Sequence, residues 1–182
     1  MLSITLDLAR LPIALVGRGE RAARRLALLR EANPLDLVIY SDDPEFTPSA
    51  GMERLPEVSD LSGRRVVYVV GLDPDTSLRI ADHARAAGAL VNVEDIPALC
   101  DFHSPSVLRR GDLCIAVSTA GTNPSLSKLL IKWLKERVGP EWEARSVELS
   151  RFRQYLRQGD LSGPEVHEAI SNRVLSAGWL LH

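Results

Sequence analysis

Between residues 12 and 22 the chain reads PIALVGRGERA, and this stretch decides the fold. Its apolar first half predicts a buried strand, and the glycines Gly17 and Gly19 end that strand in a turn. Apolar residues then recur with helical spacing across residues 22–29, before a second apolar run, LDLVIYSDD, at residues 35–43. A strand, a crossover helix and a second strand form the repeating unit of a parallel α/β sheet.

The same unit recurs downstream. The runs VVYVVG at residues 66–71 and ALVNV at residues 89–93 predict strands, and DTSLRIADHARAAG at residues 75–88 predicts a helix between them. In such sheets ligands bind beyond the carboxyl ends of the strands. We therefore expect an α/β fold built on a Rossmann-type parallel sheet, with Asp95 at one of these strand ends.

The turn after the first strand has the dinucleotide-binding spacing G-x-G-x-x-A. Gly17 permits the tight turn, Gly19 lets the backbone approach a pyrophosphate, and the small Ala22 lets the helix pack close to the sheet. The helix N-terminus adds unpaired N–H groups and a positive dipole. Arg18 stands between the glycines, where it either clamps phosphate or partly occludes it.

Asp42 lies twenty residues past Ala22, where a carboxylate can accept hydrogen bonds from the diol of an adenosine ribose. A carboxylate at this place repels a 2′-phosphate, so the sequence favours NAD over NADP as the cofactor. The alternative is an ordinary corner of strand, turn and helix with an exposed acid.

The composition of the chain argues against a nucleic-acid-binding, secreted or membrane protein. The 182 residues are 45% apolar and carry a net charge of −2, which suits one full domain with an appendage and gives no electrostatic case for nucleic acid. We find no signal-peptide pattern and no apolar run long enough to span a bilayer, so we expect a cytoplasmic protein with no membrane partner. Cys100 and Cys114 lack metal-ligand spacing and are expected to be reduced core residues.

The pattern changes after Pro105. Residues 106–119, SVLRRGDLCIAVST, predict a hairpin, and Asn123 followed by proline predicts the start of a helix. Two more helices are expected, at residues 141–158 and from Ser162 onward. Short strands are also expected at residues 2–8 and around residues 52–55.

We divide the chain into a nucleotide-binding domain (1–104), a dimerisation region (105–139) and a C-terminal helical domain (140–182). The three C-terminal helices either pack as a small appendage or build a homodimer with the hairpin. In the homodimer the partner chain covers the apolar strand at residues 113–117.

Three segments in order resemble the precorrin-2 dehydrogenase/sirohydrochlorin ferrochelatase family, a part of siroheme synthase. They are VGRGERAARR (16–25), NVEDIPALCDFHSPSVLRRGDL (92–113) and IAVSTAGTNPSLSKLL (115–130). The resemblance implies a Rossmann domain, an intertwined homodimerisation region and a C-terminal helical domain. It also implies NAD-dependent oxidation of the tetrapyrrole precorrin-2 to sirohydrochlorin, followed by insertion of Fe²⁺, a substrate metal, to give siroheme.

The resemblance also implies roles for single residues. Asp95 matches the catalytic aspartate of the family, and four positions fall where the family contacts NAD: Glu20, Arg21, Ser41 and Asp42.

The residues themselves permit this chemistry. One carboxylate at the end of a strand can serve as the base in oxidation and in metal insertion, and Asp95 is the candidate; its alternative role is the N-cap of a helical turn at residues 96–100. His103 is a candidate iron ligand, although a lone histidine in such a turn is more often structural. The substrate carries eight carboxylates, so candidate cations are Arg109, Arg110, Lys128 and Lys132, each equally readable as a solvated surface charge.

The sequence is also compatible with two other functions. One is a regulatory module that senses NAD or NADH without catalysis. The other is an enzyme of the same family that retains only one of the two activities.

Overall fold

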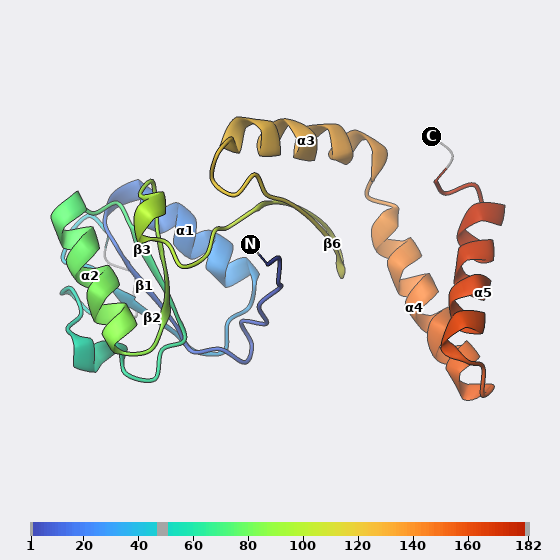
Figure 1. Ribbon diagram of the computed structural model, residues 1–182, viewed down its shortest axis with the longest axis horizontal. Helices are drawn as coiled ribbons and strands as arrows, with labels where there is room; N and C mark the ends of the chain where they lie inside the picture. The colour runs from blue at the N-terminus through green and yellow to red at the C-terminus, as the bar shows by residue number, and fades with distance from the viewer. Residues whose placement is uncertain (1, 47–50, 181–182) are drawn as a thin grey trace. The chain divides into compact units, whose positions relative to one another are not determined.

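A computed structural model describes residues 2–46 and 51–180 of the chain (Figure 1). The chain forms two compact units, Met1–Ser104 and Pro105–His182. The further division at residue 139 stays a prediction.

The first unit contains a parallel sheet of four strands. In chain order they are β1 (Ile13–Gly17), β2 (Leu37–Tyr40), β3 (Val66–Val70) and β4 (Leu90–Val93). Their order across the sheet is β2-β1-β3-β4. Every residue of β1 and β3 is buried, which explains why these strands read as continuous apolar runs and not as alternating ones.

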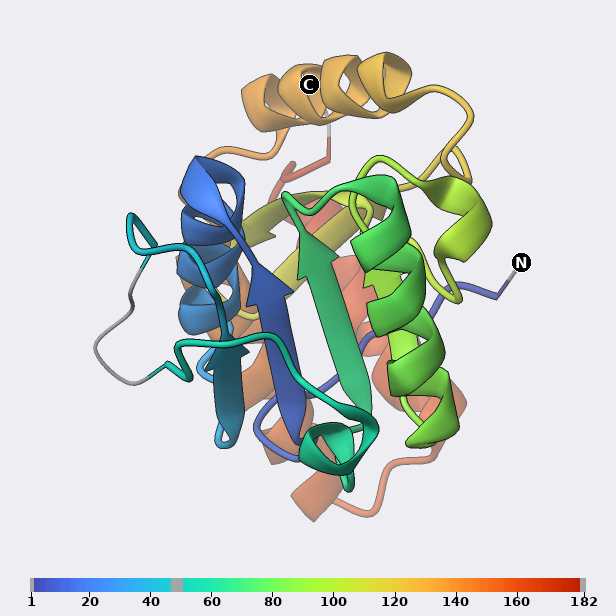
Figure 2. The same cartoon turned by 90° about the vertical axis from the view of Figure 1, so that its left-hand side faces the viewer.

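Two helices cover the sheet on opposite faces, α1 (Gly19–Glu31) and α2 (Pro74–Ala86) (Figure 2). The α1 side buries Leu26 and Leu29 against Leu15, and the α2 side buries Ile80 with Val67. Two short 3₁₀ turns complete the unit, η1 (Val58–Leu61) and η2 (Pro97–Leu99). Alternate residues of one strand therefore serve two separate cores.

The chain adds strands to the sheet on both sides of β1, although all four strands run parallel. From β1 the chain passes through α1 to β2 on one side, whereas β3 and β4 lie on the other side of β1. The loops that follow β1 and β3 therefore diverge, and a crevice between diverging loops is where open α/β sheets bind ligands.

The second unit consists of a hairpin and three helices. The hairpin pairs β5 (Ser106–Arg110) with β6 (Leu113–Val117), and the helices are α3 (Pro124–Arg137), α4 (Trp142–Gln158) and α5 (Gly163–Ser176). The Asn123 side chain caps α3 by accepting the Leu126 N–H at 3.0 Å. A capping box formed by Ser162 and Glu165 begins α5.

The expected fold class is confirmed: a parallel α/β sheet is followed by a hairpin and C-terminal helices. Three smaller expectations are wrong. Residues 2–7 form no strand, since Leu2 and Ile4 are exposed and have no covering face. The strand expected around residues 52–55 is replaced by an isolated bridge from Met52 to Tyr40. Cys114 is exposed, because burial alternates along β6.

Among the described residues, no helix is both long enough and apolar enough to cross a membrane.

Candidate functional site

An open hollow of about 490 Å³ lies at the carboxyl end of the sheet, over the loops that follow β1 and β3. Its lining comes from the first turns of α1, the loop after β2 and the loop after β3: Arg18, Gly19, Glu20, Arg21, Arg24, Asp43, Gly71 and Leu72. The hollow therefore lies where the strand order predicts a ligand.

Two glycines of the fingerprint have separate physical roles. A Cβ atom at Gly17 would lie 2.5 Å from the Val70 carbonyl oxygen and 2.9 Å from the Ala22 Cβ, so only glycine lets α1 approach the sheet this closely. Gly19 has φ of 64°, and a Cβ there would meet nothing within 4 Å. The close packing at Gly17 and the open space over Gly19 fit the binding of a dinucleotide.

A carboxylate already lies at the start of α1. The Gly19 N–H donates to Asp43 Oδ2 at 2.8 Å, and Asp43 Oδ1 accepts the Glu45 N–H at 2.9 Å. The buried Ser41 side chain supports this loop by accepting the Asp43 N–H at 3.2 Å. A carboxylate of the chain itself thus lies at the helix N-terminus, where the sequence predicts the pyrophosphate of a cofactor.

Arg18 holds the carboxylate of Asp42. Its Nε and Nη2 donate to the two Asp42 oxygens at 2.6 and 2.7 Å, and its Nη1 lies 3.6 Å from Asp73 Oδ2. The hydrogen bond from Arg18 lowers the pKa of Asp42 below its ordinary value. The guanidinium therefore lies on the predicted ribose acceptor, and the two roles that the sequence left open for Arg18, clamping phosphate or partly occluding it, stay predictions.

Asp95 follows the end of β4 and forms an ion pair with Arg21 on α1. Its side chain is 70% exposed, and its backbone has φ of 62°, in the left-handed region that aspartate tolerates better than most residues. The alternative role as an N-cap is wrong, because Ile96 is the N-cap of η2 and that cap has no side-chain hydrogen bond. The carboxylate is therefore free of a capping role.

Glu94 lies beside Asp95, and the sequence placed it after Asp95 as a candidate base. Its Oε2 is buried without a hydrogen-bond partner among the described residues. Arg21 Nη1 lies 3.7 Å from Oε2, and Arg25 Nη2 lies 3.9 Å from Oε1. Arg21 thus links the rim of the hollow to two adjacent carboxylates at the end of β4.

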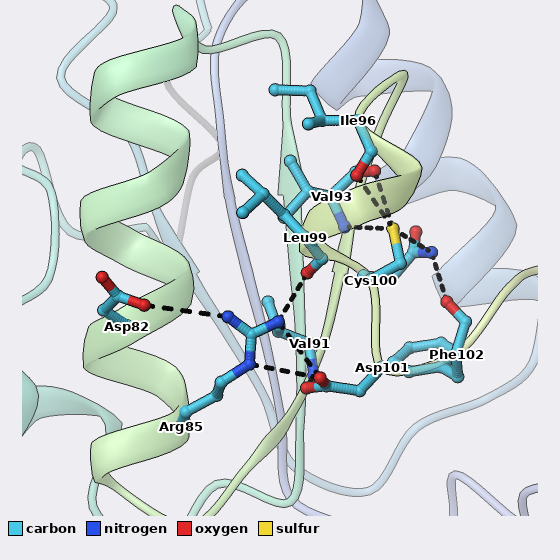
Figure 3. A network of polar contacts seen from close by, with 10 residues as sticks. Asp82, Arg85, Val91, Val93, Ile96, Leu99, Cys100, Asp101 and Phe102 are labelled. Carbon is cyan, nitrogen blue, oxygen red and sulfur yellow. Dashed lines mark hydrogen bonds and ion pairs between the residues drawn. The ribbon is translucent and has the colours of Figure 1, made fainter.

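A polar network anchors the segment that follows Asp95 in the chain (Figure 3). Arg85 of α2 donates to Asp101 Oδ1 at 3.1 Å and to the Leu99 carbonyl at 2.8 Å. Asp101 Oδ2 in turn accepts the Val91 N–H at 2.9 Å, and the Cys100 thiol donates to the Val93 carbonyl at 3.1 Å. These bonds hold residues 97–101 against β4 and α2.

His103 is half-buried in the loop that leads out of the first unit. Within residues 2–46 and 51–180, no group of three or more histidine, cysteine, aspartate or glutamate side chains could hold a metal ion. The role of His103 as an iron ligand therefore stays a prediction.

The structure brings most of the predicted cofactor residues to one edge of the sheet. Arg18, Gly19, Glu20 and Arg21 line the hollow. Gly17 ends β1, and Ser41 and Asp42 directly follow β2.

Two lining residues were not predicted from the sequence, Arg24 and Asp43. The second acid of the Ser-Asp-Asp run was a usable signal for Asp43. Gly71 and Leu72 also line the hollow, because they follow β3, which lies next to β1.

Comparisons with known proteins agree with this geometry. Residues 4–106 match the family NAD_binding_7, described as "Putative NAD(P)-binding". The chain is 34% identical over 164 residues to a siroheme synthase of Thiobacillus denitrificans and 31% identical over 196 residues to one of Methylococcus capsulatus. These alignments cover 86% and 97% of this chain but only 34% and 41% of those proteins. The chain therefore spans about a third to two fifths of the length of these curated relatives.

A solved structure titled "SirC, precorrin-2 dehydrogenase" has the same fold. It superposes with a TM-score of 0.76 at 18% identity, covering 100% of this chain and 93% of that one. The resemblance stated from the sequence is thereby confirmed at the level of the family and the fold.

Proposed function

We propose that this chain, which belongs to the family NAD_binding_7, is an NAD-dependent precorrin-2 dehydrogenase of siroheme biosynthesis. Its similarity to siroheme synthases supports the proposal. One observation carries the proposal. Arg21, which lines the dinucleotide hollow, binds Asp95, so an acid that can accept a proton is held at the edge of the cofactor site.

Dehydrogenation removes a hydride and a proton from precorrin-2, giving sirohydrochlorin, NADH and H⁺. NAD⁺, when bound, supplies the hydride acceptor. Asp95 accepts the proton, and its ion pair with Arg21 orients the carboxylate. Asp95 is also well placed to exchange that proton with solvent, because its side chain is largely exposed.

The chain's own residues would hold NAD at three points. The first turn of α1 would bind the pyrophosphate in place of the Asp43 carboxylate that accepts the Gly19 N–H, and Asp42 would accept the ribose hydroxyls. Glu20 and Arg21 line the remaining edge of the hollow. Asp42 would repel a 2′-phosphate, so we propose that NAD binds better than NADP.

The second unit carries the features for the substrate and for a homodimer. Arg109, Lys128 and Lys132 are exposed and can pair with the tetrapyrrole carboxylates, whereas Arg110 donates to the Val138 carbonyl at 2.9 Å and supports the hairpin. Side chains of α3 remain exposed in the single chain, among them Leu129 at 63% and Trp133 at 49%. We propose that a second copy of the chain covers them.

Insertion of Fe²⁺ would follow in the same protein if Asp95 also accepts the two pyrrole protons that metal insertion releases. His103 is the candidate to deliver the ion, as imidazole suits iron. This second activity and the cytoplasmic location are proposals from the sequence.

Anaerobic incubation of the protein with precorrin-2 and NAD tests the function. We expect the absorbance of sirohydrochlorin to develop first and that of siroheme to follow when Fe²⁺ is added. Sirohydrochlorin without siroheme would mean that only the dehydrogenase activity is present. Binding of NADH without any conversion of precorrin-2 would indicate a sensing module instead.

A further inference from the structure

Arg18 differs from the other arginines around the hollow in the partner that it holds. Its planar guanidinium binds both oxygens of Asp42 at 2.6 and 2.7 Å, so the carboxylate meets the cation at both of its acceptor atoms. Arg24 lines the same hollow, and among the described residues it pairs only with Glu20, one turn earlier on the same helix, at 3.3 Å. Arg18 alone among these lining arginines thus engages the predicted ribose acceptor.

Selection between the two dinucleotides depends on these same two oxygens. The ribose diol of NAD needs them as hydrogen-bond acceptors, and their negative charge is what repels the 2′-phosphate of NADP. Arg18 competes with the ribose diol for these acceptor oxygens, and its positive charge neutralises the negative charge that repels the 2′-phosphate. A guanidinium fork also matches the geometry of a phosphate, so Arg18 offers the 2′-phosphate a partner.

We propose that Arg18 is a specificity-determining residue that narrows the discrimination between NAD and NADP. The inference rests on the proposed function of this site as a dinucleotide site. It concerns the choice of cofactor and not the oxidation of the substrate.

The backbone at Arg18 permits a direct test. Its φ of −132° and ψ of 154° are extended values that any residue adopts, so Arg18→Ala leaves the turn unstrained. Arg24→Ala is the matched control, since it removes an equal charge from the same hollow without touching Asp42. Thermal melts of both variants establish that they are folded.

The measurement is the ratio of NADP⁺ to NAD⁺ dissociation constants, obtained by calorimetry for the wild type and each variant. Arg18→Ala is expected to raise the ratio about three- to fivefold, the upper part of the range for one partly exposed charge pair, and Arg24→Ala is expected to leave it within about twofold. An unchanged or lower ratio in Arg18→Ala overturns the proposal. An equal rise of the ratio in Arg24→Ala also overturns it. So does a failure of both the wild type and Arg18→Ala to bind either dinucleotide. Because the readout is affinity, failure to oxidise precorrin-2 refutes the proposed activity without altering this result.

Discussion

Replacing Asp95 by asparagine separates a catalytic role from a structural one. The change removes the charge that accepts a proton and keeps the size and shape of the side chain. Asparagine is also among the few residues that tolerate the left-handed backbone, and Asp95 has φ of 62°. Alanine at this position would add a conformational cost and so confuse the two roles.

The expected effects differ widely in size. The Arg21 and Asp95 side chains are 57% and 70% exposed, so losing their ion pair should lower the free energy of unfolding by only about 0–1 kcal/mol. Loss of a positioned general base lowers turnover by about 10²- to 10⁴-fold. We therefore expect a nearly intact fold, unchanged NAD affinity and a severe loss of precorrin-2 oxidation.

The assay compares turnover, NAD affinity and urea denaturation of the wild type, Asp95→Asn and a control. Asp160→Asn is the matched control, because Asp160 is also an exposed aspartate with positive φ, 56°, and has no part in the proposed site. Wild-type turnover by Asp95→Asn would refute the assignment of the base. Glu94, whose buried Oε2 has no hydrogen-bond partner among the described residues, would then be the next acid to test.

Three further predictions concern the cofactor, the assembly and acid stability. Asp42→Ala should abolish the preference for NAD over NADP, measured by calorimetry; a preference that persists would show that Asp42 does not contact the ribose. Light scattering should give the mass of a dimer for the wild type and of a monomer for Trp133→Asp, and a monomeric wild type would contradict the proposed interface. Asp60 has its pKa lowered to about 2 by the hydrogen bond from Arg54, so its ion pair stabilises the fold above the unfolded pKa near 3.8, and this contribution disappears as the pH falls toward 2. Urea denaturation should therefore show Arg54→Ala weaker than the wild type at pH 6 and equal to it below pH 2; a constant difference across this range would contradict the assignment.

The parallel sheet was predictable because its signals are local. The apolar strand that ends at Gly17 and the spacing from Gly17 to Ala22 are properties of adjacent residues. Proline after Asn123 and the pairing of Ser162 with Glu165 likewise predict where helices begin. The strand expected at residues 2–8 is wrong because alternation alone does not supply a neighbouring strand edge.

The charge pairs of the site could not be predicted, since they join residues far apart in the sequence. Arg18 and Asp42 are 24 positions apart, and Arg21 and Asp95 are 74 apart. From the sequence, Arg18 either clamps phosphate or partly occludes it, and its pairing with Asp42 was not predicted. That pairing depends on the strand order that places β2 beside β1.

The most direct test of the proposed activity is the stoichiometry of NADH and sirohydrochlorin under anaerobic conditions. Purified protein is mixed with precorrin-2 and NAD⁺, and both products are followed by absorbance in the same sample. If the chain is a precorrin-2 dehydrogenase, one NADH forms for each sirohydrochlorin. Sirohydrochlorin that forms at the same rate without NAD⁺, or no sirohydrochlorin in a sample that binds NAD⁺, would contradict it.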